Sequence, residues 1–365
     1  MLILIKVIAI VLGLGLILFT LQSAIRMLVL PRNDNVWLTR SLFRLVLRFI
    51  RFELRVTGDV TYERRDRHMA FFAPVTLMIL PVVWLLLVAI GYTPIYWALG
   101  YGDVYNCFLF SGSSLLTLGF APVTDWATMQ LSFSEATIGL ILIAMVIAYL
   151  PTMYSAFSER EKHVALLEVR AGNPPSATTL LIRAYNNRGT DALVQLWIDW
   201  EQNFVRLEES HTSLSPLIFF RSPRPHHSWV TASGAVLDAA ALQDSVIDME
   251  REFQGVVCIR AGYLALRGIA DFFDYPHNIN PSPDDPISIG RDEFDDAYDE
   301  LRDAGIPVVA DRDQAWRNFQ GWRVNYDDVL LMLARMTMAP YAPWSSDRSS
   351  PRMRDWFNGD RRSKR

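Results

Sequence analysis

Residues 111–121 read S-G-S-S-L-L-T-L-G-F-A, and this stretch decides how the membrane part of the chain must fold. Its residues are small, hydroxylated or apolar, and it lies between two long uncharged spans at residues 69–91 and 136–157. Residues 104–124 also carry no charge. The segment is therefore either a further membrane-crossing helix or a loop that dips into the membrane and returns.

The placement of arginine favours the returning loop. Arginines crowd residues 31–68, whereas residues 92–134 contain neither Lys nor Arg. Because Lys and Arg in short loops stay on the cytoplasmic side, the N-terminus and residues 92–134 are expected outside and everything after residue 157 in the cytoplasm. A further crossing would break this pattern, whereas a re-entrant loop keeps it. Non-helical backbone at membrane depth is tolerated only when it is buried in protein or lines a watery cavity.

Composition agrees with a protein that is part membrane and part aqueous domain. Hydrophobic residues make up 51% of the 365 residues, and the net charge of -4 implies no nucleic-acid partner. Cys107 and Cys258 fall on opposite sides of the expected membrane, which argues against a disulfide framework or a zinc site. Neither a metal site nor a catalytic arrangement is indicated by the local spacing of residues, so neither an enzyme nor a cofactor is expected.

The stretch has the chemistry of a cation site. Asp103 is placed to cap a short helix that runs to about Leu116, whose negative dipole end would attract a cation. After it, the carbonyls of Thr117 to Phe120 and the Thr117 hydroxyl would replace water around an ion, and Gly119 supplies an unusual backbone angle. The alternative is a packing surface of small residues between membrane helices.

Residues 117–121 resemble the filter of the potassium channel family, of the bacterial type with a single pore loop, whose pattern is T-V-G-Y-G. Thr117 and Gly119 match that pattern, while Leu118 and Phe120 replace its valine and tyrosine. The next two positions, a glycine and commonly an aspartate in the family, hold alanine and proline. The resemblance covers residues 69–160 and implies a homotetrameric channel in the plasma membrane, with K⁺ or another monovalent cation as the permeant ion.

The sequence thus predicts an all-α membrane protein with three transmembrane helices and a re-entrant pore loop between the second and third. Its parts are a first transmembrane helix at 1–30, a cytoplasmic basic amphipathic segment at 31–68, a pore module at 69–157, a mostly helical cytoplasmic domain at 158–348 and a disordered tail at 349–365. The pore module comprises an outer helix at 69–91, a pore helix and filter at 103–122 and an inner helix at 136–157. The first helix could instead be a signal peptide, although no convincing cleavage site follows it.

Four further residues are candidates for controlling the ion path. Asp125 at the outer mouth, and Glu159 and Glu161 at the inner mouth, carry charges that attract cations. Pro151 is a gate candidate because proline removes a helix hydrogen bond. The alternatives are solvated charges and an ordinary proline of a membrane helix.

Outside the pore module, residues 36–54 have arginines on one helical face and apolar residues on much of the rest, which favours a helix at the membrane interface over a voltage sensor. In the cytoplasmic part, helical spacing occurs at residues 164–170, 177–185, 190–208, 235–251 and 326–338, and residues 306–310 are expected to form a strand. No ligand or protein partner of this domain is indicated. The second candidate function is a non-conducting membrane-anchored sensor or scaffold that acts through this domain.

Overall fold

The computed structural model describes residues 1–28, 62–123, 125–188, 191–222, 224, 226–250 and 252–348, with residues 38, 41–42, 45–46 and 48. The predicted interfacial helix lies almost wholly outside these residues, and the predicted tail lies entirely outside them. The chain divides into a membrane unit, residues 1–59 and 71–155, and a C-terminal unit, residues 60–70 and 156–365. We describe each unit by itself.

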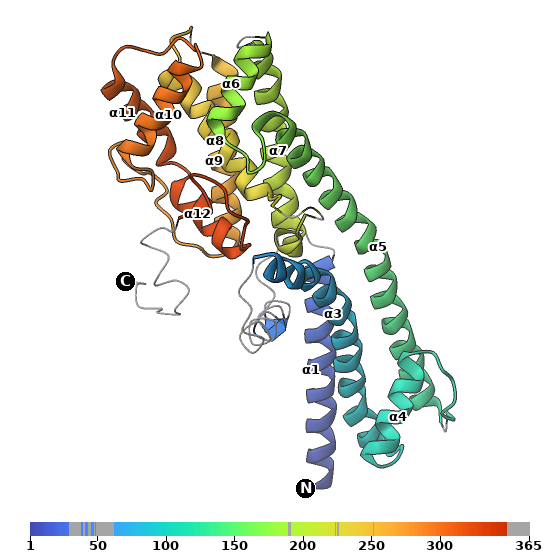
Figure 1. The fold of residues 1–365 in the computed structure, drawn as a ribbon. Helices are drawn as coiled ribbons and strands as arrows, with labels where there is room; N and C mark the ends of the chain where they lie inside the picture. Colours follow the sequence, from blue (N-terminus) through green and yellow to red (C-terminus); the bar gives the residue numbers. More distant parts are fainter. Residues whose placement is uncertain are drawn as a thin grey trace. The chain divides into compact units, whose positions relative to one another are not determined.

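The membrane unit is built from long apolar helices. They are α1 (Leu2–Leu28), α3 (Tyr62–Leu99) and α5 (Trp126–Ala171), with the short α4 (Val104–Leu115) between the last two (Figure 1). Three stretches, Leu2–Leu28, Ala70–Leu99 and Trp126–Ala171, are long and apolar enough to cross a membrane. The three predicted membrane helices are therefore confirmed as helices, and each of the last two extends beyond the predicted span.

Two glycines bring α1 and α3 into close contact. A Cβ atom on Gly13 would lie 2.4 Å from the Gly91 carbonyl oxygen, and one on Gly91 would lie 2.7 Å from Ile17 Cγ1. Neither position has room for a side chain. Membrane helices have no hydrophobic force to join them, so close backbone approach through small residues is how they gain packing energy.

The C-terminal unit is a bundle of helices around one central helix. Its helices after α5 are α6 (Ala177–Arg188), α7 (Asp191–Ser213), η1 (Ser215–Phe219), α8 (Trp229–Val246), α9 (Phe253–Phe272), α10 (Arg291–Asp303), α11 (Arg312–Arg323) and α12 (Asp327–Met336). Nearly every residue of α8 is buried, because α6, α9, α11 and α12 all pack against it (Figure 1). A helix that is apolar on all sides is expected at the centre of a domain.

The predicted strand at residues 306–310 is wrong. Within the described part of the chain this segment makes one isolated bridge, between Ile247 and Val308. Its backbone is held at the end of α8, where the Asp248 and Val309 N–H groups donate to the Pro307 and Val246 carbonyls over 2.9 Å each. An extended segment becomes a strand only with a ladder partner, and here the partner is a helix end that offers two backbone groups.

A buried ion network joins α8, α11 and α12. The guanidinium of Arg323 is fully buried and donates from Nη1 to both carboxylate oxygens of Asp238, over 2.6 and 2.8 Å. It also donates from Nε to Asp327 Oδ1 over 2.7 Å and from Nη2 to the Trp344 carbonyl over 2.6 Å. The Tyr326 hydroxyl donates to Asp238 Oδ1 over 2.8 Å. The network ties residues 85 positions apart in the sequence.

A second buried cation, Arg160, joins the C-terminal part of α5 to η1. Its Nη1 donates to the Leu217 carbonyl over 3.0 Å and its Nη2 to the Phe220 carbonyl over 2.6 Å. His211 lies beside it, with Nδ1 2.8 Å from the Leu207 carbonyl and Nε2 3.4 Å from Arg160 Nη1. A carbonyl can only accept, so Nδ1 carries the proton; a guanidinium can only donate, so Nε2 is an acceptor and the imidazole is neutral. Burial, and then the charge of Arg160, lower the pKa of His211 to about 3.

The C-terminal unit is therefore expected to lose stability as the pH falls below the pKa of an exposed histidine, 6.5. The unfolded chain takes up a proton on His211 that the folded chain refuses, so the stability is fully present above that pH and falls progressively toward pH 3. Between pH 7.5 and 5 the free energy of unfolding should drop by about 2 kcal/mol from this residue. Urea denaturation at the two pH values measures the drop, and His211→Gln should reduce it by that amount. An unchanged pH dependence in the variant would contradict this assignment.

Candidate functional site

The short helix α4 begins and ends where the sequence predicts. The Asp103 side chain accepts from the Asn106 N–H over 2.9 Å, so it is the N-cap. The helix ends at Leu115, directly before residues 117–121. Its buried face includes Cys107, Phe110 and the serines at 111, 113 and 114.

The loop that follows α4 wraps around one serine. The Leu118 and Gly119 N–H groups donate to the Ser113 carbonyl, over 2.8 and 3.4 Å. The N–H groups of Phe120 and Ala121 donate to the Ser113 hydroxyl oxygen, over 3.1 and 3.2 Å. Four consecutive N–H groups thus converge on the two oxygens of Ser113.

This convergence fixes where the carbonyls of the loop point. In a trans peptide the carbonyl of one residue points opposite to the N–H of the next, and the bonds here are trans. Because the N–H groups of residues 118–121 face Ser113, the carbonyls of residues 117–120 face away from it. No hydrogen bond among the described residues ends on these four carbonyls. They are the four oxygens that the sequence predicts as ion ligands.

The backbone angles explain how consecutive peptides take the same orientation. Thr117 and Gly119 have positive φ angles of 54° and 69°, while Leu118 and Phe120, between and after them, do not. Residues with positive φ, placed between residues without it, can turn successive N–H groups to one concave side. A threonine with positive φ is uncommon, and here its hydroxyl donates to the Leu116 carbonyl over 2.8 Å.

Beside α4 lies a buried acidic residue that is not among the predicted site residues. Glu135 on α5 is fully buried and accepts from the Tyr96 hydroxyl over 2.8 Å and from the Ser111 hydroxyl. Among the described residues no Lys or Arg pairs with it. The signal in the sequence was a carboxylic acid one residue before the predicted inner helix, and an ionisable group at membrane depth is a functional candidate by default.

Aromatic rings fill the space beside this acid. The Tyr96 ring packs edge-on against Phe110 of α4 at 4.8 Å, and Tyr101 packs against Phe110 at 4.3 Å between ring centres. The Tyr101 hydroxyl donates to the Pro122 carbonyl over 2.9 Å. The far end of the loop is thereby attached to the chain that precedes α4.

The other predicted site residues are Asp125, Pro151, Glu159 and Glu161. The three acids contact residues close to them in the structure. Asp125 is the N-cap of α5, because its Oδ1 accepts from the Ala127 and Thr128 N–H groups over 2.8 and 3.0 Å. Pro151 is exposed within an unbroken α5. Glu159 lies 3.2 Å from Arg206 and Glu161 lies 2.9 Å from Arg160, both in the C-terminal unit. The structure therefore brings Thr117, Leu118, Gly119 and Phe120 together with their support, and it gives the three acids structural contacts.

Comparison of the chain with protein-family models, with curated proteins and with solved structures gave no match. The resemblance of residues 117–121 to the potassium channel filter therefore stays an expectation from the sequence.

Proposed function

We propose that the chain forms a potassium-channel-like cation channel with a homotetrameric pore in the plasma membrane, its N-terminus outside and its C-terminal domain cytoplasmic. The observation that carries the proposal is the orientation of four successive peptides, whose N–H groups bind Ser113 and whose carbonyls face the opposite side. Carbonyl oxygens without a full charge suit a conducting site, since a cation must both bind and leave.

A homotetramer is proposed because the loop of one chain cannot surround an ion. A single loop presents its carbonyls on one side only, and an ion that gives up its water needs oxygens all round. Leu118 and Phe120 are 60% and 57% exposed in the single chain, which leaves their side of the loop available to other copies. Four loops around one axis would enclose the ion, with α5 lining the path below the filter and Pro151 as its candidate gate.

The three predicted acids contribute little to cation attraction in this proposal. Asp125 is occupied at the start of α5, and Glu159 and Glu161 face arginines. Their charge is largely compensated or exposed to water, where it is screened. Selection of cations therefore depends on the carbonyls and on the end of α4, whose dipole is negative there.

Gly119→Ala is expected to reduce potassium flux about tenfold or more, because the left-handed angle costs alanine about 1–2 kcal/mol in every chain. Neither Gly119 nor Gly112 has an atom within 4 Å of an added Cβ, but only Gly119 has a positive φ. Gly112→Ala is therefore the matched control and should conduct normally. Flux of K⁺ into liposomes that contain the purified protein measures both.

Two results would overturn the channel: no potassium flux in the wild type, or equal flux in the two alanine variants. Wild-type protein without flux would favour the non-conducting sensor or scaffold, in which the C-terminal domain is the working part. A strict monomer in detergent would also contradict the homotetramer.

A further inference from the structure

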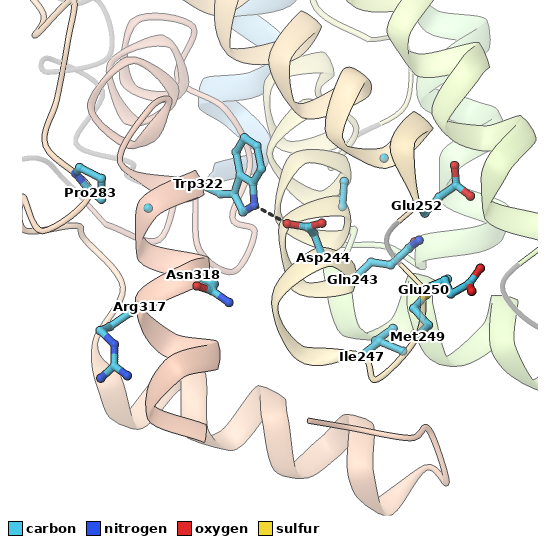
Figure 2. A pocket seen from close by; sticks show the side chains of 13 residues that line it. Gln243, Asp244, Ile247, Met249, Glu250, Glu252, Pro283, Arg317, Asn318 and Trp322 are labelled. Carbon is cyan, nitrogen blue, oxygen red and sulfur yellow. Dashed lines mark hydrogen bonds between the residues drawn. The ribbon is translucent and has the colours of Figure 1, made fainter. Parts of the chain in front are cut away.

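Glu135 has surroundings unlike those of Asp238 and Asp244 in the C-terminal unit. Asp238 is paired with Arg323, and Asp244 lines a cavity of about 490 Å³, where the Trp322 indole N–H donates to it over 2.8 Å (Figure 2). Glu135 is fully buried, and it is the one charged side chain among residues 70–99, 104–115 and 126–158 of α3, α4 and α5. A carboxyl group in such a place is stable only if hydrogen bonds compensate its charge or a proton removes it.

The donors that face Glu135 suit an ionised carboxylate. The Tyr96 hydroxyl of α3 donates to Oε2 over 2.8 Å, and the Ser111 hydroxyl of α4 donates to Oε1. Each carboxylate oxygen thus has one donor. Hydrogen bonds to an ionised group are about twice as strong as those between neutral groups, so the two bonds hold α3 and α4 firmly to α5.

Two other titratable groups lie one helical turn before these donors. Tyr92 on α3 has its hydroxyl 2.8 Å from Ser134 Oγ, and the Cys107 thiol on α4 donates to the Gly102 carbonyl over 3.6 Å. Each is therefore engaged elsewhere. Among the described residues, the direct side-chain partners of Glu135 are Tyr96 and Ser111.

The same contacts also suit a protonated acid. Ser111 Oγ lies 3.2 Å from the Ala89 carbonyl oxygen as well, and a hydroxyl has one proton to donate. When Glu135 is ionised, that proton goes to the carboxylate, and the Ala89 carbonyl still accepts from the Thr93 hydroxyl over 2.7 Å. When Glu135 is protonated, its own O–H can donate to Ser111, which then donates to Ala89. Reversal of one hydroxyl group therefore satisfies either charge state.

The charge state of Glu135 bears on the loop through α4. Ser111 lies two residues before Ser113, whose two oxygens accept from the N–H groups of residues 118–121. A proton on Glu135 turns a charge-assisted bond to α4 into a neutral one and removes a negative charge beside the helix whose negative end faces the loop. Both changes weaken the binding of a cation by the loop.

We propose that Glu135 is a proton-binding site that regulates the loop, which attracts cations strongly while Glu135 is ionised and weakly once Glu135 has bound a proton. Glu135 is thus a positioning residue that acts through Ser111. The regulation rests on the proposed channel function, whereas binding of the proton does not.

Potassium flux into liposomes, measured from about pH 5 to pH 9, tests the regulation. Flux through the wild type should fall about fivefold or more at the acidic end, as when a charge-assisted bond becomes neutral in each chain. Glu135→Gln has nearly the same shape, and its amide donates to Ser111 and accepts from Tyr96 as a protonated acid would. This variant should conduct at the acidic wild-type level at every pH, with a melting temperature in detergent that shows it is folded.

Two tyrosine variants form a matched pair. Tyr96→Phe and Tyr92→Phe each remove a buried hydroxyl from α3, but only the Tyr96 hydroxyl donates to Glu135. Tyr96→Phe should therefore move the midpoint of the pH dependence, and Tyr92→Phe should leave it in place. Equal effects of the two variants would contradict the assignment to Glu135.

Infrared difference spectra between acidic and alkaline pH follow the proton without any flux. The wild type should show the C=O stretch of a protonated carboxyl group that Glu135→Gln lacks. The proposal is overturned by identical spectra, by wild-type flux that does not change with pH, or by a Glu135→Gln variant that keeps the wild-type pH dependence. A pH dependence that comes from His211 would persist in that variant. Absence of flux at every pH would overturn the channel, and the infrared band would still show whether Glu135 binds a proton.

Discussion

Replacing Arg323 with methionine is expected to cost the C-terminal unit about 3–5 kcal/mol of stability, as when one partner of a buried ion pair is removed. The loss is large because methionine fills the space of the side chain but leaves the Asp238 carboxylate in the core. That carboxylate is 2% exposed, and among the residues that the structure describes it would keep only the Tyr326 hydroxyl as a donor. Asp327 would be affected less, because Ser288 donates to it from both N–H and hydroxyl over 2.7 Å each.

The measurement is urea denaturation of the purified full-length protein in detergent, followed by tryptophan fluorescence. Arg317→Met is the control on the same helix; its side chain is exposed, so its effect should stay within about 0.5 kcal/mol. Arg323→Lys should also destabilise, because a single ammonium group cannot reach acceptors on three sides. Adding Asp238→Asn to Arg323→Met should recover part of the loss, since the uncompensated charge is then gone. A double variant as unstable as the sum of its parts would show that the buried charge is not the cause.

The parts of the fold that the sequence predicted are those with local causes. Apolar runs with few or no charges are long enough to cross a membrane, and they lie within α1, α3 and α5. Asp103 caps α4 by accepting from the N–H of Asn106, three residues further along the chain. Such a cap depends only on neighbouring residues, so the sequence alone can reveal it.

Other elements depend on partners that are remote in sequence. α9 and α11 are not among the predicted helices: α9 contains three glycines, of which Gly262 has no room for a side chain against Leu237 and Phe204, and α11 is mostly polar. Packing against α8 overrides these weak local preferences. The Asp238–Arg323 pair could not be predicted either, because the two residues are 85 positions apart and no local pattern links them.

In the candidate site, the contacts of the three serines of α4 are what the sequence could not predict. Small and hydroxylated residues in the stretch predicted a loop, but they did not reveal that each serine has its own task. Ser111 donates to Glu135, Ser113 accepts from four N–H groups of the loop, and Ser114 accepts from Ser132 over 2.9 Å. Two of these partners belong to α5, so α4 is attached to α5 through side chains as well as through packing. Disturbance of α5 should therefore reach the loop.

Gly139→Ala adds one methyl group to α5 at its contact with α4 and so tests whether a change in α5 reaches the loop. A Cβ on Gly139 would lie 2.3 Å from the carbonyl oxygen of Leu115, the last residue of α4. No rotamer change can relieve the clash, because the opposing atom is backbone and its helix end must move. Forcing extra volume into a packed site costs about 1–3 kcal/mol, and the movement would displace Ser113 and the four carbonyls that depend on it. We expect a lower melting temperature in detergent and loss of potassium flux in liposomes.

The matched control is Gly15→Ala on α1, where an added Cβ has no atom within 4 Å. Alanine in place of glycine within a helix is itself favourable by about 0.5–1 kcal/mol, so this control should melt at or above the wild-type temperature and conduct normally. Gly139→Ala has the same intrinsic gain, and a net loss must therefore come from the contact with Leu115. The melting temperature tests the packing and the flux tests the function, so the two can fail separately. A lower melting temperature with normal flux would mean that the position of α4 does not govern conduction, whereas an unchanged melting temperature would mean that α4 and α5 do not meet at Gly139.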